Sequence, residues 1–356
     1  MRNGEICAID ANSRQMRAVF RLCPTPSQGL LAAVIATLAL ATSPALAMHG
    51  DPFVHLSGVA PAASTSAGAD AQSANPDIAR LLARPASLWD RIRNGYAIPD
   101  LKNDPLVAQH ERWWAARPAL LGAILERSRK YLYFIVEGLE RRGMPLELAL
   151  LPIVESGYDP LASSSAQALG LWQFIPATGA RYNLAQNARV DARRDVIAST
   201  GAALEYLESL YALHKDWQLA LASYNWGENA VLRAAKRVDA KGETPSFGAL
   251  SLPAETRHYV PRLQALKNII AKPEAFGVVL PEIANEPYFV TVTVPATPAL
   301  DLATAAKLAE MTSAEFRALN PAFNDGQIAH PHIGHLVLPV DRAEAFETNL
   351  ARRAAQ

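Results

Sequence analysis

Two segments of this chain are apolar on almost every side, and each of them ends in polar or aromatic residues. The first runs from Leu146 to Val154 and delivers a single carboxylate, Glu155, at its end. The second runs from Trp217 to Asn225 and carries Tyr224 near its end. A helix that is hydrophobic all round belongs in the interior of a domain. Two buried helices of this kind can bring their polar ends together across one cleft, which predicts a helical domain built around them.

The polar loop that follows Glu155 supplies the groups that a carbohydrate cleft needs. It contains hydroxyls at residues 163–165 and then a glycine-led turn, Gly170 to Phe174, which carries an indole at Trp172 and an amide at Gln173. Apolar neighbours raise the pKa of a buried carboxyl group, so Glu155 is expected to hold a proton near neutral pH. An indole offers a flat face to a sugar, while a few polar groups orient it. The alternative interpretation is an ordinary solvated or salt-bridged glutamate at a helix end.

The other helical signals extend this pattern into one large, mainly helical domain over residues 81–275. Prolines open or end most of the periodic apolar segments, and the 25 prolines of the chain argue for helices separated by turns. Pro152 lies inside the helix predicted for residues 145–156 and is expected to kink it just before the glutamate. The helices predicted in this domain span residues 88–96, 105–118, 119–141, 145–156, 176–182, 196–213, 217–225 and 255–271.

A proline-rich stretch separates the helical domain from a smaller unit. Residues 276–287 are interpreted as a linker. Residues 288–340 then read strand, helix, helix, strand, with a capping box from Thr312 to Glu315 at the start of the second helix. Residues 341–356 form the predicted C-terminal tail. The histidines at positions 330, 332 and 335 have no clustered acid or thiol, so we interpret them as part of a loop and predict no metal site.

The N-terminal residues 1–47 have the pattern of an export signal. Arginines precede a short apolar run, and Ala45-Leu46-Ala47 matches the small-x-small pattern before a signal peptidase cleavage site. We predict cleavage after Ala47 and a location in the periplasm, with a retained N-terminal anchor as the alternative. Cys7 and Cys23 both precede the apolar run, so neither can become a lipid-modified N-terminus. Residues 48–80 are rich in Ala, Ser, Gly and Pro and are predicted to be a flexible linker.

Charge and cysteine content exclude several classes of partner and chemistry. The formal net charge is zero at pH 7, and no block of basic residues marks a nucleic-acid surface. Both cysteines lie in the predicted signal peptide, so the mature protein is expected to have neither disulfides nor thiol chemistry. Because the chain has no net charge and no basic block, we expect no nucleic-acid partner.

Four motifs occur in one order along the chain. They are ES at 155–156, GLWQF at 170–174, ASYN at 222–225 and ETRHYVP at 255–261, with LWDRIR at 88–93 and VDARRD at 190–195 as further matches. Together they resemble the lytic transglycosylases of the soluble-transglycosylase (SLT) type, and specifically the membrane-bound lytic murein transglycosylase D group. The resemblance covers about residues 85–340.

The charges of residues 190–195 have two interpretations. They bind substrate or, in the interpretation that we favour, form a salt-bridged loop between helices.

The C-terminal unit resembles a LysM module, the peptidoglycan-binding appendage that is common in this family. Its strand-helix-helix-strand order and the sequence LNP at 319–321 carry the likeness. Where a LysM module usually has an early glycine-aspartate-threonine turn, the chain reads PATPALDL. The resemblance implies a mainly α fold class: a lysozyme-like (goose-type, SLT) helical catalytic domain followed by a small α+β LysM-like domain.

The resemblance also implies a reaction, namely cleavage of the β-1,4 bond between N-acetylmuramic acid and N-acetylglucosamine without water, giving a 1,6-anhydro product. Glu155 would act first as general acid and then as base, and no metal or cofactor is required. The nearby loop offers no second carboxylate at the spacing of a paired-acid glycosidase, since Asp159 lies only four residues further on. The residues carried over as substrate-binding or orienting are Ser164, Trp172, Gln173, Tyr224, Asn225 and Tyr259.

Two other functions are compatible with the same residues. One is a hydrolytic muramidase on the same fold, as in goose-type lysozymes. The other is a non-catalytic scaffold whose cleft only grips the glycan of the cell wall. The expected partner in each case is the peptidoglycan glycan strand. We expect a monomer with peripheral association to the cell wall or the membrane.

Overall fold

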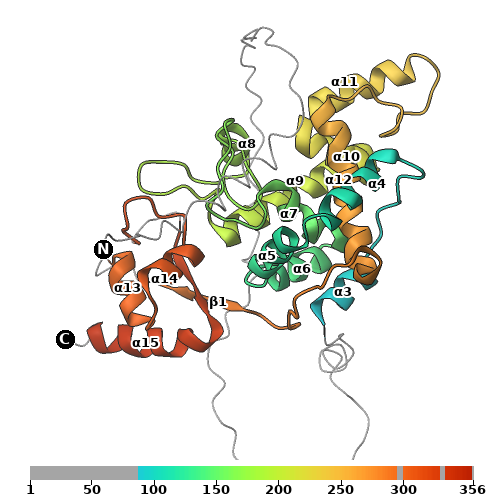
Figure 1. The fold of residues 1–356 in the computed structure, drawn as a ribbon. Helices are drawn as coiled ribbons and strands as arrows, with labels where there is room; N and C mark the ends of the chain where they lie inside the picture. The colour runs from blue at the N-terminus through green and yellow to red at the C-terminus, as the bar shows by residue number, and fades with distance from the viewer. Residues whose placement is uncertain (1–86, 295–299, 329–332, 355–356) are drawn as a thin grey trace, which may run out of the picture. The chain divides into compact units, whose positions relative to one another are not determined.

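The computed structural model of this protein describes residues 87–294, 300–328 and 333–354 (Figure 1). Helices make up nearly all of the regular structure up to residue 276, and a two-stranded sheet with its own helices follows. The helical part comprises α3 (Leu88–Asn94), α4 (Pro105–Ala115), α5 (Pro118–Ser128), α6 (Leu132–Arg141), η1 (Leu146–Leu150), α7 (Leu151–Glu155), α8 (Pro176–Arg181), α9 (Val196–His214), α10 (Trp217–Trp226), α11 (Glu228–Asp239), α12 (Ala254–Ala271) and η2 (Pro273–Phe276).

Helix α10 is the buried helix that the second apolar segment predicts. Its consecutive residues Leu219 to Ser223 are all buried, as expected of a helix without a polar face. The helix starts after Asp216, whose side chain accepts a hydrogen bond from the backbone N–H of Leu219 (2.9 Å). It ends at Gly227, whose φ of 94° is readily accessible only to glycine. Helices α9, α11 and α12 surround it.

The first apolar segment is buried as predicted, but it does not form one kinked helix. Residues Leu146 to Leu150 are a 3₁₀ helix, and the α-helix α7 begins only at Leu151. Pro152 lies in the first turn of α7, where its missing N–H removes no hydrogen bond within the helix. The proline therefore starts a short helix instead of kinking a long one, and Glu155 is the last residue of that helix.

The helix predicted for residues 119–141 is also divided. It consists of α5 and α6, separated by residues 129–131, of which Tyr131 is buried. An interruption of about one turn keeps the next apolar residues on the same side of the chain. Two successive helices therefore give the periodic pattern of one long helix.

The smaller unit has the predicted strand-helix-helix-strand order. Strands β1 (Phe289–Thr293) and β2 (His335–Pro339) pair antiparallel, with Thr291 opposite Val337. Helices α13 (Leu302–Leu308) and α14 (Ser313–Leu319) lie between them in the chain. The capping box is confirmed, because the Thr312 hydroxyl accepts from the Glu315 N–H while the Glu315 carboxylate accepts from the Thr312 N–H.

Two boundaries of the smaller unit differ from the prediction. The predicted C-terminal tail is a helix, α15 (Val340–Ala354), which buries Phe346 completely and contacts both strands. This helix is mostly polar, and it packs against the core through Ala343, Phe346 and Leu350, which are three and four residues apart. The predicted linker, residues 276–287, packs against the helical domain: Val278 and Ile283 are buried, and the Trp89 indole donates to the Pro281 carbonyl at 2.8 Å.

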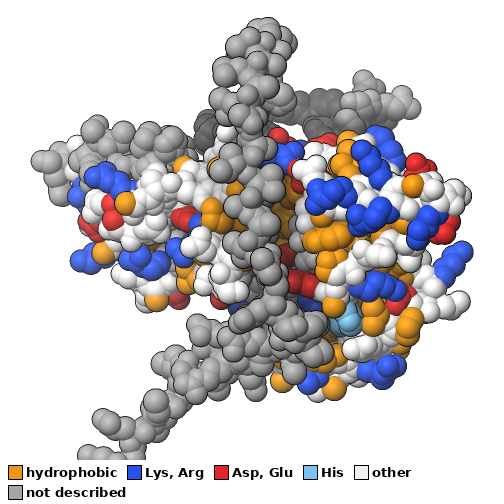
Figure 2. All heavy atoms as spheres, turned by 90° about the horizontal axis from the view of Figure 1, so that it is seen from above, with side chains coloured by type: hydrophobic (Ala, Val, Ile, Leu, Met, Phe, Trp, Pro, Cys, Tyr) orange, Lys and Arg blue, Asp and Glu red, His pale blue; other side chains and the backbone are white. Residues whose placement is uncertain are grey.

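The surface carries charges of both signs. On the face shown in Figure 2, basic side chains are interspersed with acidic and hydrophobic ones. Among the described residues, no helix is both long enough and apolar enough to cross a membrane.

Candidate active site

The carboxyl group of Glu155 lies at the C-terminal end of α7, where the helix ends and the predicted polar loop begins. The residues before it, from Leu151 to Val154, are all buried, and Glu155 itself is only partly exposed. Removal of water around the carboxylate disfavours its charged form, and this raises the pKa of Glu155 from 4.5 to about 7. A carboxyl group with this pKa both gives and takes a proton near neutral pH.

Two tyrosines from different helices lie next to this carboxyl group. The hydroxyl of Tyr259, in α12, donates a hydrogen bond to Glu155 Oε1. The hydroxyl of Tyr224, near the end of α10, donates to the backbone carbonyl of Trp172 at 2.9 Å. Burial raises the pKa of both tyrosines well above 10, and the negative charge of Glu155 raises it further. Both hydroxyls therefore stay protonated and remain hydrogen-bond donors at any physiological pH.

Two charged residues of α12 act on the acid in opposite directions. Beyond burial, the Tyr259 hydrogen bond and the positive charge of Arg262 lower the pKa of Glu155, whereas the negative charge of Glu255 raises it. Asp159, the nearest acid in the sequence, is used in its own turn, where its Oδ1 accepts from the Leu161 N–H at 2.9 Å. Among the described residues, Glu155 shares no hydrogen bond with a second carboxylate.

Asn225 ties the end of α10 to the start of α12. Its Oδ1 accepts a hydrogen bond from the hydroxyl of Thr256 at 2.7 Å, and Thr256 is buried. Asn225 itself is half-buried. This bond keeps the two helix ends that carry Tyr224 and Tyr259 in register.

The glycine-led turn is held against α7 by Ser156, the residue after the acid. The buried Ser156 hydroxyl donates to the Leu171 carbonyl at 2.9 Å. Within the turn, Gln173 adopts a φ of 49°, and its side-chain amide donates to the Gly170 carbonyl at 2.9 Å. Gln173 is half-buried, and its Oε1 makes no hydrogen bond to the described residues. The amide oxygen can therefore accept from a ligand.

Ser164 shapes the loop and makes no hydrogen bond to the acid. Its exposed hydroxyl accepts from the N–H groups of Ala166 and Ala168, at 3.2 and 3.1 Å. Its backbone N–H donates to the Ala168 carbonyl at 3.0 Å. This pattern closes a tight turn in front of Gly170.

The prediction that Trp172 offers a flat face to a sugar is wrong. The indole is 1% exposed, and its Nε1 donates to the buried hydroxyl of Thr200 in α9 at 3.0 Å. A ring that is enclosed on both faces cannot stack on a ligand. Trp172 contributes to the site only through its backbone carbonyl, which accepts from Tyr224. The side chain of Trp226, at the end of α10, is half-buried and keeps part of its surface open.

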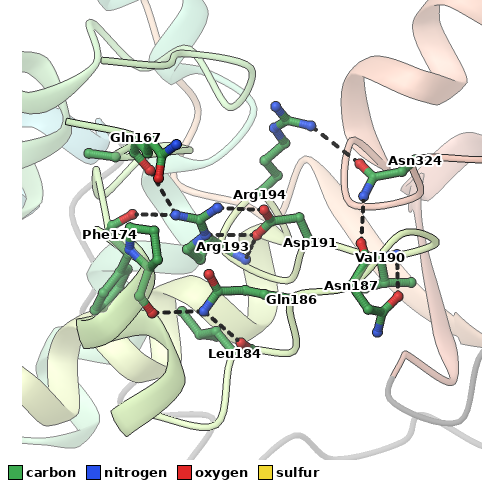
Figure 3. Close-up of polar contacts among 12 residues, drawn as sticks. Gln167, Phe174, Leu184, Gln186, Asn187, Val190, Asp191, Arg193, Arg194 and Asn324 are labelled. Atoms are coloured by element: carbon green, nitrogen blue, oxygen red, sulfur yellow. Dashed lines mark hydrogen bonds and ion pairs between the residues drawn. The ribbon is translucent and has the colours of Figure 1, made fainter. Parts of the chain in front are cut away.

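A buried arginine, Arg193, anchors the loop that carries the turn (Figure 3). Its guanidinium forms a two-pronged ion pair with Asp191, with contacts of 2.9 and 2.6 Å. It also donates to the carbonyls of Gln167 and Phe174, at 2.8 and 3.3 Å. Segment 190–195 is thus a salt-bridged loop, and the charge of Arg193 is used inside the protein.

Gly170 is required by this anchoring. Its φ is 81°, and a Cβ atom there would lie 2.1 Å from the backbone carbonyl oxygen of Arg193. We expect Gly170→Ala to destabilise the protein by at least about 2 kcal/mol, because backbone strain and a clash add together. Gly143→Ala is the matched control, since Gly143 has a φ of 62° with no atom near its Cβ position. Urea unfolding checks this, and equal losses for both variants would contradict the clash.

Sequence reasoning missed several of these residues. Ser156, Thr256 and Arg193 position the site. Each lies inside one of the motifs, but the motif alone does not reveal its role. Their pairing partners are between 2 and 31 residues away in the chain. No cluster of three His, Cys, Asp or Glu side chains that could hold a metal occurs in the described parts of the chain.

Comparison with known proteins gives two family matches. The family described as "Transglycosylase SLT domain" matches residues 133–247. The family described as "Lytic transglycosylase MltD, LysM-like domain" matches residues 290–355, which includes helix α15. The predicted combination of a lysozyme-like helical domain with a small LysM-like module is confirmed by these matches together with the observed elements.

Several curated proteins are similar to this chain. Membrane-bound lytic murein transglycosylase D of Escherichia coli (strain K12) is 34% identical over 271 residues, which are 76% of this chain and 59% of that protein. A putative tributyltin chloride resistance protein of Alteromonas sp. (strain M-1) is 37% identical over 178 residues, 49% of this chain and 83% of that protein. Membrane-bound lytic murein transglycosylase C of Glaesserella parasuis serovar 5 (strain SH0165) is 30% identical over 151 residues, 37% of this chain and 40% of that protein.

The similarity to the Escherichia coli protein therefore spans about three fifths of that relative's length. Both family matches fall on the two units that the structure describes, one on the helices around Glu155 and one on the β1–β2 module. This chain belongs to the family of transglycosylase SLT-domain proteins, as a member that also carries an MltD-type LysM-like domain.

Proposed function

We propose that this protein is a lytic murein transglycosylase, which cleaves the β-1,4 bond between N-acetylmuramic acid and N-acetylglucosamine without water. The observation that carries the proposal is one carboxyl group with a pKa of about 7, hydrogen-bonded by Tyr259 and by no second carboxylate among the described residues. A paired-acid glycosidase needs two carboxyl groups facing each other across the bond. A single acid that returns to its starting state within one reaction is sufficient for an internal ring closure.

The first step is a proton transfer. Protonated Glu155 gives its proton to the glycosidic oxygen as the bond from C1 of N-acetylmuramic acid to that oxygen breaks. Positive charge develops at C1, and the acetamido oxygen of the same sugar attacks C1 and takes up this charge. The N-acetylglucosamine end leaves with the proton as a free hydroxyl group.

The second step uses the same residue as a base. Glu155, now a carboxylate, takes the proton from the C6 hydroxyl of N-acetylmuramic acid. The C6 oxygen then attacks C1, and the bond from C1 to the acetamido oxygen breaks. The product is a 1,6-anhydro sugar, and Glu155 ends the cycle protonated, as it began. A pKa near neutrality suits both steps, because neither the giving nor the taking of the proton is strongly uphill.

Five of the carried-over residues support these steps in the proposal. Gln173 and Asn225 are half-buried amides next to the acid's loop and helix, and they orient the sugar through hydrogen bonds. Tyr224 and Tyr259 stay protonated and hold the loop and the acid in place. Ser164 acts on the sugar through the shape of its turn and its exposed hydroxyl.

The mass of the products tests the proposal. Purified protein is incubated with peptidoglycan sacculi, and the soluble fragments are analysed by mass spectrometry. A transglycosylase releases fragments that are lighter by one water than those of a muramidase. Fragments with the mass of the hydrolysed sugar would instead support the muramidase alternative. The absence of any released fragment would support a wall-binding scaffold.

The pH dependence of cleavage provides a second prediction. The acid step needs protonated Glu155, so kcat/KM falls as pH rises through its pKa of about 7. Tyr259→Phe removes a hydrogen bond that stabilises the carboxylate, so the pKa rises and the fall moves to higher pH. Glu255→Gln removes a negative charge, so the pKa of Glu155 falls and the decrease in kcat/KM moves to lower pH. Profiles of kcat/KM against pH check this, and shifts of both variants in one direction would contradict it.

We also propose that the protein acts in the periplasm as a monomer on glycan strands, with the LysM-like module adding affinity for the cell wall. The predicted signal peptide and linker, residues 1–80, lie outside the described residues. The names of the relatives and the LysM-like match support an envelope location. Cell fractionation and the N-terminal sequence of the mature protein test the export signal and the cleavage after Ala47.

A further inference from the structure

Arg262 is an unusual arginine in this structure. It lies in α12 and is half-buried, yet its guanidinium makes no hydrogen bond or ion pair with any described residue. The other described arginines without such a partner, Arg112, Arg233, Arg237, Arg317 and Arg353, are all exposed. A partly desolvated guanidinium cannot lose its charge, so it favours a position where an anion reaches it.

The position of Arg262 on its helix places it beside the acid. It follows Tyr259, which holds Glu155, by three residues, and His258 by four. Residues three and four apart share one face of a helix, so Arg262 lies on the side of α12 that carries Tyr259 and His258. Its positive charge acts on residues of this face and on the acid. It opposes the rise in pKa that burial causes at Glu155, and it adds to the fall in pKa that burial causes at His258.

The neighbouring groups leave Arg262 as the available cation of this face. His110 in α4 lies against His258, with 3.1 Å between their ring nitrogens. Burial lowers the pKa of His110 to about 4 and also lowers that of His258, so both rings are neutral at pH 7. The nearby Arg257 is already paired with Asp104 at 2.6 Å.

The remaining acids do not neutralise Arg262. Glu255 is exposed at the start of α12, seven residues and about two helical turns away. Glu155 is protonated for part of the reaction and is bonded to Tyr259. Arg262 is thus a half-buried permanent cation on the face of α12 that carries Tyr259, with no partner among the described residues. Such a cation is suited to a negatively charged group of the substrate.

We propose that Arg262 is a specificity-determining residue that binds a carboxylate carried by the N-acetylmuramic acid side of the glycan strand. The inference rests on the proposed function, since that function puts N-acetylmuramic acid beside Glu155. The guanidinium fork fits a carboxylate through two parallel N–H···O bonds. N-acetylglucosamine has no carboxylate, so this contact distinguishes the two alternating sugars and sets the register of the strand.

The carboxylate has two possible sources, and three substrates separate them. The lactyl group of N-acetylmuramic acid is a free carboxylate in strands without peptides. In strands with peptides the lactyl group is an amide, and the stem peptide supplies carboxylates instead. The substrates are peptide-bearing strands, the same strands after amidase treatment, and amidase-treated strands whose lactyl carboxylates have been converted to neutral methylamides.

The variants are Arg262→Ala, Arg262→Lys and the matched control Arg233→Ala, which removes an exposed unpartnered arginine from α11. We expect Arg262→Ala to raise KM roughly tenfold, with little change in kcat, on strands that carry the recognised carboxylate. Arg262→Lys restores part of this loss, and Arg233→Ala behaves as wild type. A loss on amidase-treated strands identifies the lactyl carboxylate, whereas a loss confined to peptide-bearing strands identifies the stem peptide.

Two results would overturn the proposal: an unchanged KM for Arg262→Ala on every substrate, or an equal loss on the neutral methylamide strands. A binding experiment separates this inference from the proposed reaction. Affinities of the same strands are measured for Glu155→Gln with and without Arg262→Ala, so no cleavage is needed. If the wild-type protein cleaves nothing but the Arg262 difference persists in binding, the reaction is wrong and carboxylate recognition stands.

Discussion

Glu155→Gln is expected to lower the rate of murein cleavage by about a hundredfold to ten-thousandfold, the usual contribution of a general acid. Glutamine keeps the shape of the side chain and can still accept a hydrogen bond from Tyr259, but it has no acidic proton to give. In the proposed mechanism Glu155 serves both proton transfers, so one substitution removes both. The rate of release of soluble fragments from sacculi measures the effect. Equal release by the variant and the wild type would rule out the catalytic assignment and favour a wall-binding scaffold.

The stability of the same variant provides its internal control. The pKa of Glu155 is about 7 in the folded protein and 4.5 for an unperturbed glutamate. The folded state therefore binds the proton more tightly, and the free energy of unfolding decreases as pH rises from about 4.5 to about 7 and then levels off. Above pH 7 this cost amounts to at most about 3 kcal/mol, and Glu155→Gln removes it.

Glu155→Gln should consequently be more stable than the wild type at pH 8 and equally stable near pH 4. Urea unfolding at the two pH values checks this. A variant that is inactive and more stable at pH 8 has lost chemistry and not its fold. A variant that is less stable at pH 8 would contradict the raised pKa.

Arg193→Ala is expected to reduce the free energy of unfolding by about 3–5 kcal/mol, the usual cost of breaking a buried ion pair. The substitution leaves Asp191, which is 13% exposed, without its partner. It also removes the Arg193 donor from the carbonyl of Gln167, which precedes the glycine-led turn, and from that of Phe174, the last residue of the turn. We expect murein cleavage to fall as well, because Gln173 lies in that turn.

Arg189→Ala is the matched control for this experiment, since it removes an arginine from the same loop. The Arg189 side chain is 65% exposed, and among the described residues its only polar contact is an ion pair with Asp325 at 3.6 Å. Exposed ion pairs of this kind contribute about 0–1 kcal/mol. Urea unfolding and cleavage rates measured side by side test the contrast. Similar losses for the two variants would mean that the loop is sensitive to any change of charge.

Several elements of the fold could be predicted from local sequence patterns, and one could not. The apolar segments before Glu155 and Tyr224 are buried as predicted, because a helix without a polar face has no stable place at the surface. The capping box at Thr312 is likewise a local signal, since its two hydrogen bonds join residues three apart. The break between α5 and α6 left no such signal, because the apolar periodicity continues across it.

The sequence by itself determined the apolar segments, the carboxylate at the end of one of them and the order of the motifs, because these depend on residues close together in the chain. Only the tertiary structure decided which polar and aromatic groups are buried and which stay accessible near the acid. Trp172 is buried because Thr200 in another helix receives its indole N–H, and Arg193 turns inward because Asp191 and two carbonyls surround it. From the sequence alone, Trp172 would equally suit a platform for a sugar, and the charges around Arg193 would equally suit an exposed loop. Burial and pairing across distant segments settle the choice, since the cost of an unpaired buried polar group depends on neighbours that the local sequence does not contain.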